Sequence, residues 1–243
     1  MSAGVTRTAI VAAMSGELKP MVRGWHPSRS ETVKLWAHRD ENLYVAACAG
    51  AGQAAATRAF AAIEKDAPID LAFSIGWAGA LTSDVATGNA YNVAGVIDVQ
   101  TGERFRCDAG AGEHWLATSP KVADETEKKR LASTYNASLV DMEAAAIARL
   151  AHMRGIPFYC IKGVSDDFND KLPDFNRFIA PSGEFQTVQF ALYALLKPWY
   201  WPALIRMGEN SRRASQSIAE SLLNFLDDRG HVEERNGYSN LKP

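Results

Sequence analysis

Hydrophobic residues gather along the chain in short runs that alternate with stretches of helical periodicity. Five runs predict strands, at residues 9–14, 43–49, 71–75, 90–98 and 157–164, and residues 139–140 predict the end of a further strand. Four stretches predict helices, at residues 53–65, 141–154, 184–196 and 209–226. Strands that alternate with helices are typical of an α/β fold, in which helices cover both faces of a sheet.

The same pattern indicates a single domain. No internal repeat, low-complexity block or linker divides the sequence, so we predict one domain over residues 1–228. Residues 229–243 are polar and contain glycine and asparagine, which predicts a loose C-terminal tail.

Composition limits the classes of protein that fit. The 243 residues are 47% hydrophobic and 22% charged, with a formal net charge of −2. These values exclude dominant disorder and argue against nucleic acid as a partner. Cys48 and Cys160 lie inside hydrophobic runs, where free thiols suit a reducing compartment, so we expect a cytoplasmic protein. The five histidines show no metal-ligand spacing with cysteines or acids, and we expect no metal site.

One segment leaves a membrane contact open. Residues 8–14 are too short for a signal peptide, and no uncharged hydrophobic stretch reaches the ~18 residues of a membrane-spanning helix. Residues 185–207 are rich in aromatic side chains and are interrupted by Pro198 and Pro202. They fit a core-packing helix followed by a turn. They also fit an interfacial patch, with Trp199–Trp201 at a membrane surface.

Polar residues follow the predicted strands. In open α/β sheets, ligands bind beyond the carboxyl ends of the strands. The residues at these positions are Ser15, Glu17, Gly50, Gly52, Gly76, Trp77, Gly79, Asp141, Met142, Glu143, Ser165, Asp166 and Asp167. A carboxylate in a half-desolvated cleft is suited to general-acid work, and a carboxylate can also accept two hydroxyl donors of a sugar. Each acid also fits the first turn of a helix, so spacing alone leaves both interpretations open.

The turn from Gly50 to Gly52 fits the loose dinucleotide pattern G-x-G-x-x-A between a strand and a helix. Such a turn lets backbone N–H groups approach a ligand, although packing alone explains it equally well. The next predicted strand ends in Gly76 and lacks the aspartate or glutamate that would bind the ribose of a dinucleotide. An NAD-dependent oxidoreductase is therefore an alternative rather than the first interpretation.

Five segments together resemble the nucleoside phosphorylase and nucleosidase superfamily, and in pattern the 5′-methylthioadenosine/S-adenosylhomocysteine nucleosidases. They are AIVAAMSGEL (9–18), AGAGQAAA (49–56), IGWAGAL (75–81), VDMEAAAIA (140–148) and IPFYCIKGVSD (156–166). The resemblance implies a mixed central sheet and cleavage of the N-glycosidic bond of a purine nucleoside, with adenine as the expected base and water as the attacking group. It implies no cofactor and a homodimer.

The resemblance also implies roles for individual residues. Glu17 matches the glutamate that activates water, and Glu143 the one that binds the ribose hydroxyls beside Met142. Asp166 matches the acid that protonates purine N7, with support from Ser165. Such a cleavage passes through an oxocarbenium-like state. The leaving base needs a proton and the sugar needs a nearby negative charge, so one carboxyl group must be protonated and another ionised.

The chain departs from the family in the second glycine turn and in two other places. Trp77 replaces a small hydroxyl residue, and residues 73–75 lack the phosphate-binding arginine of phosphorolytic relatives, which favours water. Arg23 or Arg104 remains available to bind phosphate. Residues 119–123 lack the aromatic expected to stack on the base. Together with the short region 106–139, Trp77 keeps a catalytically inactive nucleoside-binding module as a third alternative.

Residues 197–222, KPWYWPALIRMGENSRRASQSIAESL, resemble the end of a hopanoid-associated subgroup. That resemblance implies phosphorolysis of adenosylhopane, a lipid-linked adenine nucleoside, with inorganic phosphate as co-substrate. It also implies a membrane contact through Trp199–Trp201.

Overall fold

The computed structural model describes residues 7–38, 43–108, 112–170 and 172–239. In these residues the strands are β1 (Thr8–Ala12), β2 (His26–Ser30), β3 (Val33–Ala37), β4 (Tyr44–Cys48), β5 (Leu71–Ala80), β6 (Ala90–Asp98), β7 (Arg104–Arg106), β8 (His114–Thr118), β9 (Leu139–Asp141) and β10 (Phe158–Asp166). The helices are α1 (Ser15–Leu18), α2 (Gln53–Glu64), α3 (Glu125–Tyr135), α4 (Ala144–Arg154), α5 (Thr187–Leu195) and α6 (Trp201–Ser239), with short 3₁₀ turns η1 (Phe175–Phe178) and η2 (Pro198–Tyr200).

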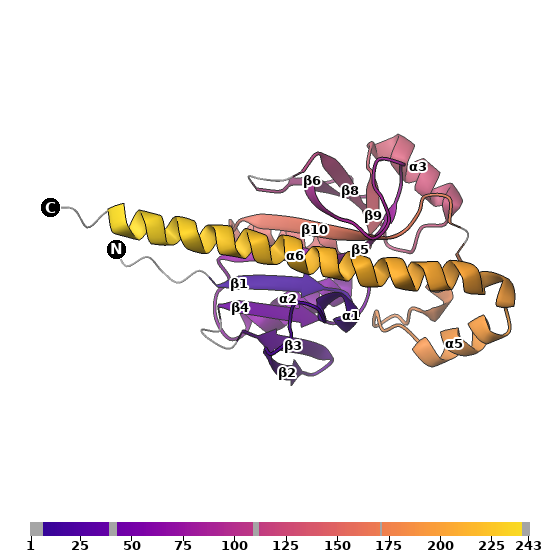
Figure 1. Cartoon of the computed structure of the whole chain (residues 1–243), viewed down its shortest axis with the longest axis horizontal. Helices are drawn as coiled ribbons and strands as arrows, with labels where there is room; N and C mark the ends of the chain where they lie inside the picture. The colour runs from indigo at the N-terminus through magenta and orange to yellow at the C-terminus, as the bar shows by residue number, and fades with distance from the viewer. Residues whose placement is uncertain (1–6, 39–42, 109–111, 171, 240–243) are drawn as a thin grey trace.

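The strands form one mixed sheet with β5 at its centre (Figure 1). β5 pairs in parallel with β1 and β10, and β1 pairs in parallel with β4. β3 and β2 extend this side of the sheet as an antiparallel hairpin. On the other side, β10, β6, β8 and β9 return to the end of β5, so that five strands close a ring. The mixed α/β sheet is therefore confirmed.

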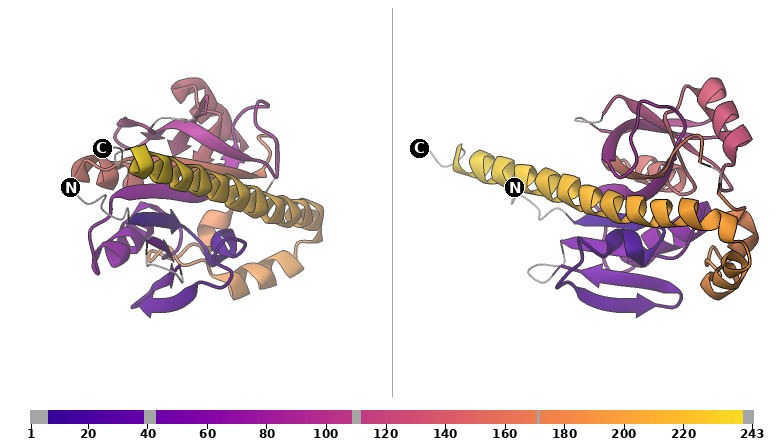
Figure 2. Two further views of the ribbon diagram at one scale, coloured as in Figure 1. Left: turned by 60° about the vertical axis from the view of Figure 1, so that its left-hand side comes forward. Right: turned by 45° about the vertical axis from the view of Figure 1, so that its right-hand side comes forward.

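Helices cover both faces of the sheet, as the sequence predicts. Ala9 and Val11 of β1 share a core with Phe60 of α2 and Ile147 of α4. The alternate β1 residues, Ile10 and Ala12, share a second core with Ile218 and Leu222 of α6. Figures 1 and 2 show α6 lying across the sheet, with α5 near its N-terminal end. The long helix α6 thus connects the central strands to the segment around α5.

The structure departs from the predicted elements in several places. β5 continues through Gly76 and Gly79 to Ala80, because β10 pairs with it at this point. The β2–β3 hairpin, the strands β7 and β8, the short helix α1 and the polar helix α3 were not predicted. α6 continues as a helix through Ser239, so residues 229–239 are not the loose tail that their composition indicated, and residues 240–243 lie outside the described residues. A domain boundary at residue 228 stays a prediction.

A buried ion pair joins the strands that form the ring. Lys162 of β10 is 1% exposed, and its Nζ lies 3.0 Å from Oδ2 of Asp141 at the end of β9. Asp141 also accepts hydrogen bonds from the Thr118 hydroxyl (2.7 Å) and from the backbone N–H of Ala144 at the start of α4 (2.9 Å). Burial acts to lower the pKa of Lys162, but the acidic groups around it, Asp141 foremost, together outweigh burial and raise the pKa. The pair therefore fixes three strands and one helix at a single point.

We expect Lys162→Met to destabilise the protein by about 3–5 kcal/mol, because it leaves the Asp141 carboxylate buried without its cation. Urea denaturation measures the change. The exposed Lys129, which pairs with Glu125 one turn away on α3, provides the control. Lys129→Met should cost less than about 1 kcal/mol. Equal effects of the two substitutions would contradict the structural role of the buried pair, whereas partial recovery in Lys162→Met with Asp141→Asn would support it.

Candidate active site

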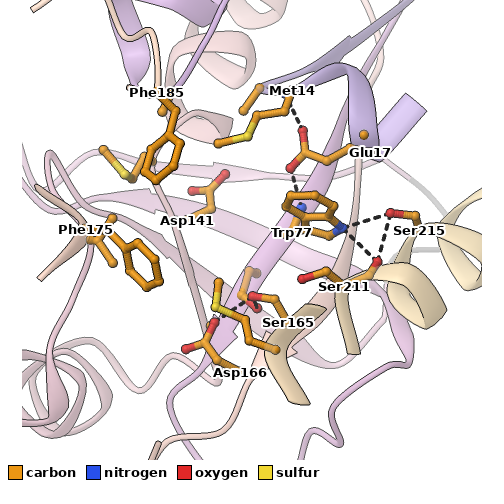
Figure 3. A pocket seen from close by; sticks show the side chains of 18 of the residues that line it. Met14, Glu17, Trp77, Asp141, Ser165, Asp166, Phe175, Phe185, Ser211 and Ser215 are labelled. Carbon is orange, nitrogen blue, oxygen red and sulfur yellow. Dashed lines mark hydrogen bonds between the residues drawn. The ribbon is translucent and has the colours of Figure 1, made fainter. Parts of the chain in front are cut away.

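A cavity of about 820 Å³ opens at the carboxyl ends of β1, β5 and β10. Eight of the residues predicted at the strand ends line it: Glu17, Trp77, Gly79, Asp141, Met142, Glu143, Ser165 and Asp166. Figure 3 shows several of these side chains around the same space. Gly50, Gly52 and Gly76 do not line the cavity. Gly52 holds Glu143 through its N–H, Gly76 leaves room for Glu17, and the N–H of Gly50 donates to the Ala13 carbonyl. The structure thus brings residues from separate strand ends together at one cavity.

Glu17 is a buried carboxylate held by two backbone donors. Its Oε2 accepts a hydrogen bond from the N–H of Met14 (2.7 Å), and its Oε1 accepts one from the N–H of Trp77 (2.8 Å). A Cβ atom at Gly76 would lie 2.7 Å from Oε1, so a glycine is required there for the carboxylate to approach β5. Burial raises the pKa of Glu17, although these backbone hydrogen bonds and the charge of Lys162 oppose the rise. A raised pKa suits a general base that works near neutral pH.

Glu143 is oriented by the first glycine turn. Its Oε1 accepts a hydrogen bond from the N–H of Gly52 at 2.6 Å. Burial, together with the nearby charge of Asp141, raises the pKa of Glu143 to about 8, although Lys162 opposes the rise. Its side chain does not cap α4, a task that Asp141 performs instead. The helix-cap explanation thus fits Asp141, and Glu143 is left to face the cavity.

The same turn has no free backbone donor for a dinucleotide. The N–H of Gly50 donates to the carbonyl of Ala13 (3.0 Å), and the N–H of Ala51 donates to the carbonyl of Gly183 (2.8 Å). The N–H of Gly52 is taken by Glu143. A diphosphate would need these groups, so the feature that suggested an NAD-dependent oxidoreductase serves internal contacts instead.

Asp166 accepts hydrogen bonds at both carboxylate oxygens. The Ser165 hydroxyl donates to Oδ1 at 2.6 Å, and the ammonium of Lys128 donates to Oδ2. Lys128 comes from α3, lines the cavity and is 4% exposed. The sequence indicated a half-desolvated carboxylate at this position. The structure adds a buried cation beside it, which no motif revealed.

Trp77 ties the cavity to α6. Its indole N–H lies 3.0 Å from the Ser211 carbonyl and 2.9 Å from the Ser215 hydroxyl, both on α6 (Figure 3). Its ring packs over Gly16, where an added Cβ would lie 3.2 Å from the ring edge. The indole is therefore engaged in holding α6, and the backbone N–H of Trp77 holds Glu17.

Aromatic rings enter the cavity from an unexpected part of the chain. Phe175, Phe185 and Phe190 line it, together with Leu204 and Met207. Figure 3 shows Phe175 and Phe185 on the side opposite Trp77. The loop at residues 119–123 lacks an aromatic, but the side chain of Asn176 binds both backbone groups of Val122 and so joins this loop to η1. Aromatic side chains thus reach the cavity from a later segment, next to the loop that lacks one.

Exposed cations stand at one edge of the cavity. Lys19, Arg23 and Arg212 are exposed and belong to its lining. Arg104 instead lies over the ring of Trp115, 5.4 Å from its centroid, and does not line the cavity. Of the two arginines predicted as possible phosphate ligands, Arg23 lines the cavity and Arg104 does not.

Comparison with known proteins agrees with this architecture. Residues 101–192 match the family model described as the phosphorylase superfamily. The chain is 32% identical over 98 residues to 5′-methylthioadenosine/S-adenosylhomocysteine nucleosidase from Shewanella halifaxensis, a match that covers 40% of this chain and 35% of that protein. The Shewanella oneidensis enzyme of the same name matches at 32% identity over 84 residues, covering 34% of this chain and 29% of that protein. The chain thus spans about a third of the length of these curated relatives.

Solved structures are similar over nearly the whole chain. A Helicobacter pylori 5′-methylthioadenosine/S-adenosylhomocysteine nucleosidase gives a TM-score of 0.69 at 15% identity, covering 93% of this chain and 99% of that one. An Arabidopsis thaliana 5′-methylthioadenosine nucleosidase gives 0.66 at 18% identity, covering 91% and 96%. The chain has the fold of these nucleosidases. Its resemblance to the phosphorylase superfamily, stated above from five motifs, is confirmed at that level.

The raised pKa of Glu143 predicts a pH-dependent stability. Folded Glu143 binds its proton up to about pH 8, whereas the ordinary value is 4.5, so its stabilising contribution is lost as the pH rises through this window. We expect the Tm of the wild type, relative to Glu143→Gln, to fall between pH 5 and about pH 9. Differential scanning fluorimetry measures it. Glu220→Gln, at an exposed position on α6, is the control whose Tm difference should stay flat. A flat difference for Glu143→Gln as well would show that its carboxylate ionises normally.

Proposed function

We propose that the protein hydrolyses the N-glycosidic bond of a purine nucleoside and releases adenine. One observation carries this proposal: three carboxylates from separate strand ends meet in one cavity, and each has a different set of partners. The backbone N–H groups of Met14 and Trp77 donate to Glu17, and those of Gly52 and Met142 donate to Glu143. Asp166 instead accepts from a hydroxyl and a cation. The superfamily match supports the same class of reaction. A solved Helicobacter pylori relative is described with 5′-methylthioadenosine in its active site.

The three carboxylates perform separate tasks in this proposal. Asp166 passes a proton to N7 as the bond between the sugar and N9 breaks and its electron pair moves to the purine. Glu143 binds the ribose hydroxyls and lies next to the oxocarbenium-like sugar. Glu17 takes a proton from the water that attacks the sugar. Met142 lies beside Glu143 at the cavity wall and contacts the nucleoside.

Water is the nucleophile that the charges around Glu17 favour. The cation whose charge acts on Glu17 is Lys162, and this lysine is committed to Asp141. Arg23 is exposed at the cavity edge, so a phosphorylase would have to draw it inward. A chromatographic assay with methylthioadenosine, S-adenosylhomocysteine and adenosine tests the proposal. Adenine release without phosphate supports hydrolysis, release only with phosphate overturns it in favour of phosphorolysis, and release in neither condition overturns nucleoside cleavage for these substrates.

We expect Asp166→Asn to lower kcat by about 10²–10⁴-fold, because a positioned proton donor contributes that much. Adenine release in the same assay measures it. Asp174→Asn is the matched control, since Asp174 is an exposed residue that caps η1 and does not line the cavity. Near wild-type turnover by Asp166→Asn would exclude this carboxylate as the donor. Measurable turnover by the wild type would also eliminate the inactive binding module. A homodimer stays a prediction from the resemblance.

A lipid-linked nucleoside such as adenosylhopane, cleaved by phosphorolysis, is the second candidate. Two features favour a substrate with a large hydrophobic 5′ group. The first is the wall of Phe175, Phe185, Phe190, Leu204 and Met207 inside the cavity. The second is the outer side of the same segment, residues 185–207, which we call the aromatic arm. Exposed hydrophobic side chains on the arm include Leu196 (76% exposed), Trp199 (63%) and Ile205 (61%).

The charges of the aromatic arm suit an anionic lipid surface. Its two charged residues, Lys197 and Arg206, are both positive. The Lys197 ammonium lies 4.9 Å from the ring centroid of Trp199, so an aromatic ring and a cation face outward together, as they do at membrane interfaces. No helix in the described part of the chain has the length and hydrophobicity to cross a bilayer. A contact of this kind would therefore lie along the membrane surface.

We expect the protein to float with anionic liposomes and the double variant Trp199→Ala with Trp201→Ala to lose most of this binding. Flotation on a sucrose gradient measures it. Met153→Ala on α4 removes a side chain that is 73% exposed and distant in sequence from the arm, and it should leave binding unchanged. Absence of wild-type binding, or equal binding by the double variant, would remove the membrane contact from the account.

A further inference from the structure

Lys128 is a buried cation that the proposed mechanism has not yet used. It lies on α3 and is 4% exposed, yet it belongs to the lining of the cavity. Its ammonium donates hydrogen bonds to Oδ2 of Asp166 and, at 2.7 Å, to the carbonyl of Asp167. The fold makes room for this contact. A Cβ atom at Gly79 would lie 3.0 Å from Oδ2 of Asp166 and 3.3 Å from Cε of Lys128.

The hydrogen bonds around Asp166 raise the question of where the proton for the purine is stored. The hydroxyl of Ser165 donates to Oδ1 and the ammonium of Lys128 donates to Oδ2, so both oxygens act as acceptors. Of these two donors the Lys128 ammonium is the charged one, and it carries three N–H groups. A buried lysine can release one of its protons. Lys128 is therefore a proton-bearing group in direct contact with the proposed general acid.

Resting on the proposed function, we propose that Lys128 supplies the proton of the leaving purine and that Asp166 relays it to N7. As the bond from the sugar to N9 breaks, its electron pair moves into the purine. N7 takes a proton through the Asp166 carboxylate, and Asp166 takes one from Lys128. Lys128 is left as a neutral amine beside the Asp166 carboxylate, and it regains a proton from solvent after the base leaves. The water that attacks the sugar gives its own proton to Glu17, and Glu17 releases it to solvent. One proton thus enters at Lys128 and one leaves at Glu17, so the charges balance over the cycle.

A lysine that supplies a proton can be distinguished from one that only forms a structural ion pair with Asp166. A structural cation is replaceable by any residue that keeps the positive charge next to Asp166. A proton supply is not replaced by arginine, because a guanidinium stays protonated in proteins. It also becomes unnecessary when the leaving group departs without a proton. Lys128→Arg and a substrate with such a leaving group therefore distinguish the two.

The experiment compares Lys128→Arg and Lys128→Met with the wild type on two substrates, methylthioadenosine and a nitrophenyl riboside. We expect both variants to lose about 10²–10⁴-fold in kcat on the nucleoside, the range of general-acid catalysis, and to stay within a few fold of wild type on the nitrophenyl substrate. Lys129→Arg, next to it on α3 but exposed, is the matched control and should behave as wild type. Circular dichroism confirms that each variant is folded.

Two results overturn the proposal. The first is near wild-type cleavage of methylthioadenosine by Lys128→Arg, which would make Lys128 a structural cation. The second is an equal loss on both substrates, which would make its role one of shaping the cavity. A wild type that releases no adenine overturns the proposed function itself, a result distinct from both. If the wild type cleaves only the nucleoside, the arginine variant alone decides between a proton supply and a structural cation.

Discussion

The arrangement of the site depends on the ion pair between Lys162 and Asp141. It lies where β8, β9, β10 and the start of α4 meet, and it is almost fully buried. Burying two charges is costly unless their remaining donors and acceptors are satisfied, and here Thr118, Ser74 and the N–H of Ala144 satisfy them. The pair also sets the charges of the cavity. Asp141 raises the pKa of Glu143, and Lys162 opposes the rise at both Glu143 and Glu17.

From this centre the cavity divides into a polar end and a hydrophobic end. The polar end consists of carboxylates at strand ends. Backbone N–H groups hold Glu17 and Glu143, whereas the Ser165 hydroxyl and the Lys128 ammonium hold Asp166. The hydrophobic end comes from η1, α5 and the start of α6, which lie outside the sheet. Trp77 connects the two ends, because its backbone holds Glu17 while its indole holds α6. Chemistry and substrate choice can therefore be assigned to different parts of the chain.

Much of the fold and half of the site follow from local sequence patterns. The runs that became β1, β4, β5, β6 and β10 are hydrophobic because helices cover both faces of the sheet there. The carboxylates were found because the chain leaves each strand at the same edge. Gly76 was identified as a turn, but it lies inside β5 and gives Glu17 room to approach. That role depends on a contact across 59 positions of sequence, which no local pattern encodes.

Lys128 and the aromatic wall were missed for a related reason. Lys128 lies in a polar helix, ETEKKRLASTY, and looks like any solvated lysine until α3 packs beside β10. The start of this helix is marked by Asp124, whose side chain accepts a hydrogen bond from the N–H of Glu127. Because the helix contains no hydrophobic run, it was not predicted. Phe185 and Phe190 were noticed as an aromatic stretch, but their sequence suits a core, a membrane or a pocket equally. Only tertiary packing brings both residues to the cavity.

The central claim is that the carboxylates at these strand ends direct water to the sugar of a purine nucleoside. The most direct measurement is cleavage of methylthioadenosine in water labelled with heavy oxygen, in the presence of inorganic phosphate, followed by mass spectrometry of the sugar product. The account predicts adenine and a free sugar that carries the label. A sugar phosphate without the label, or intact nucleoside, would contradict it.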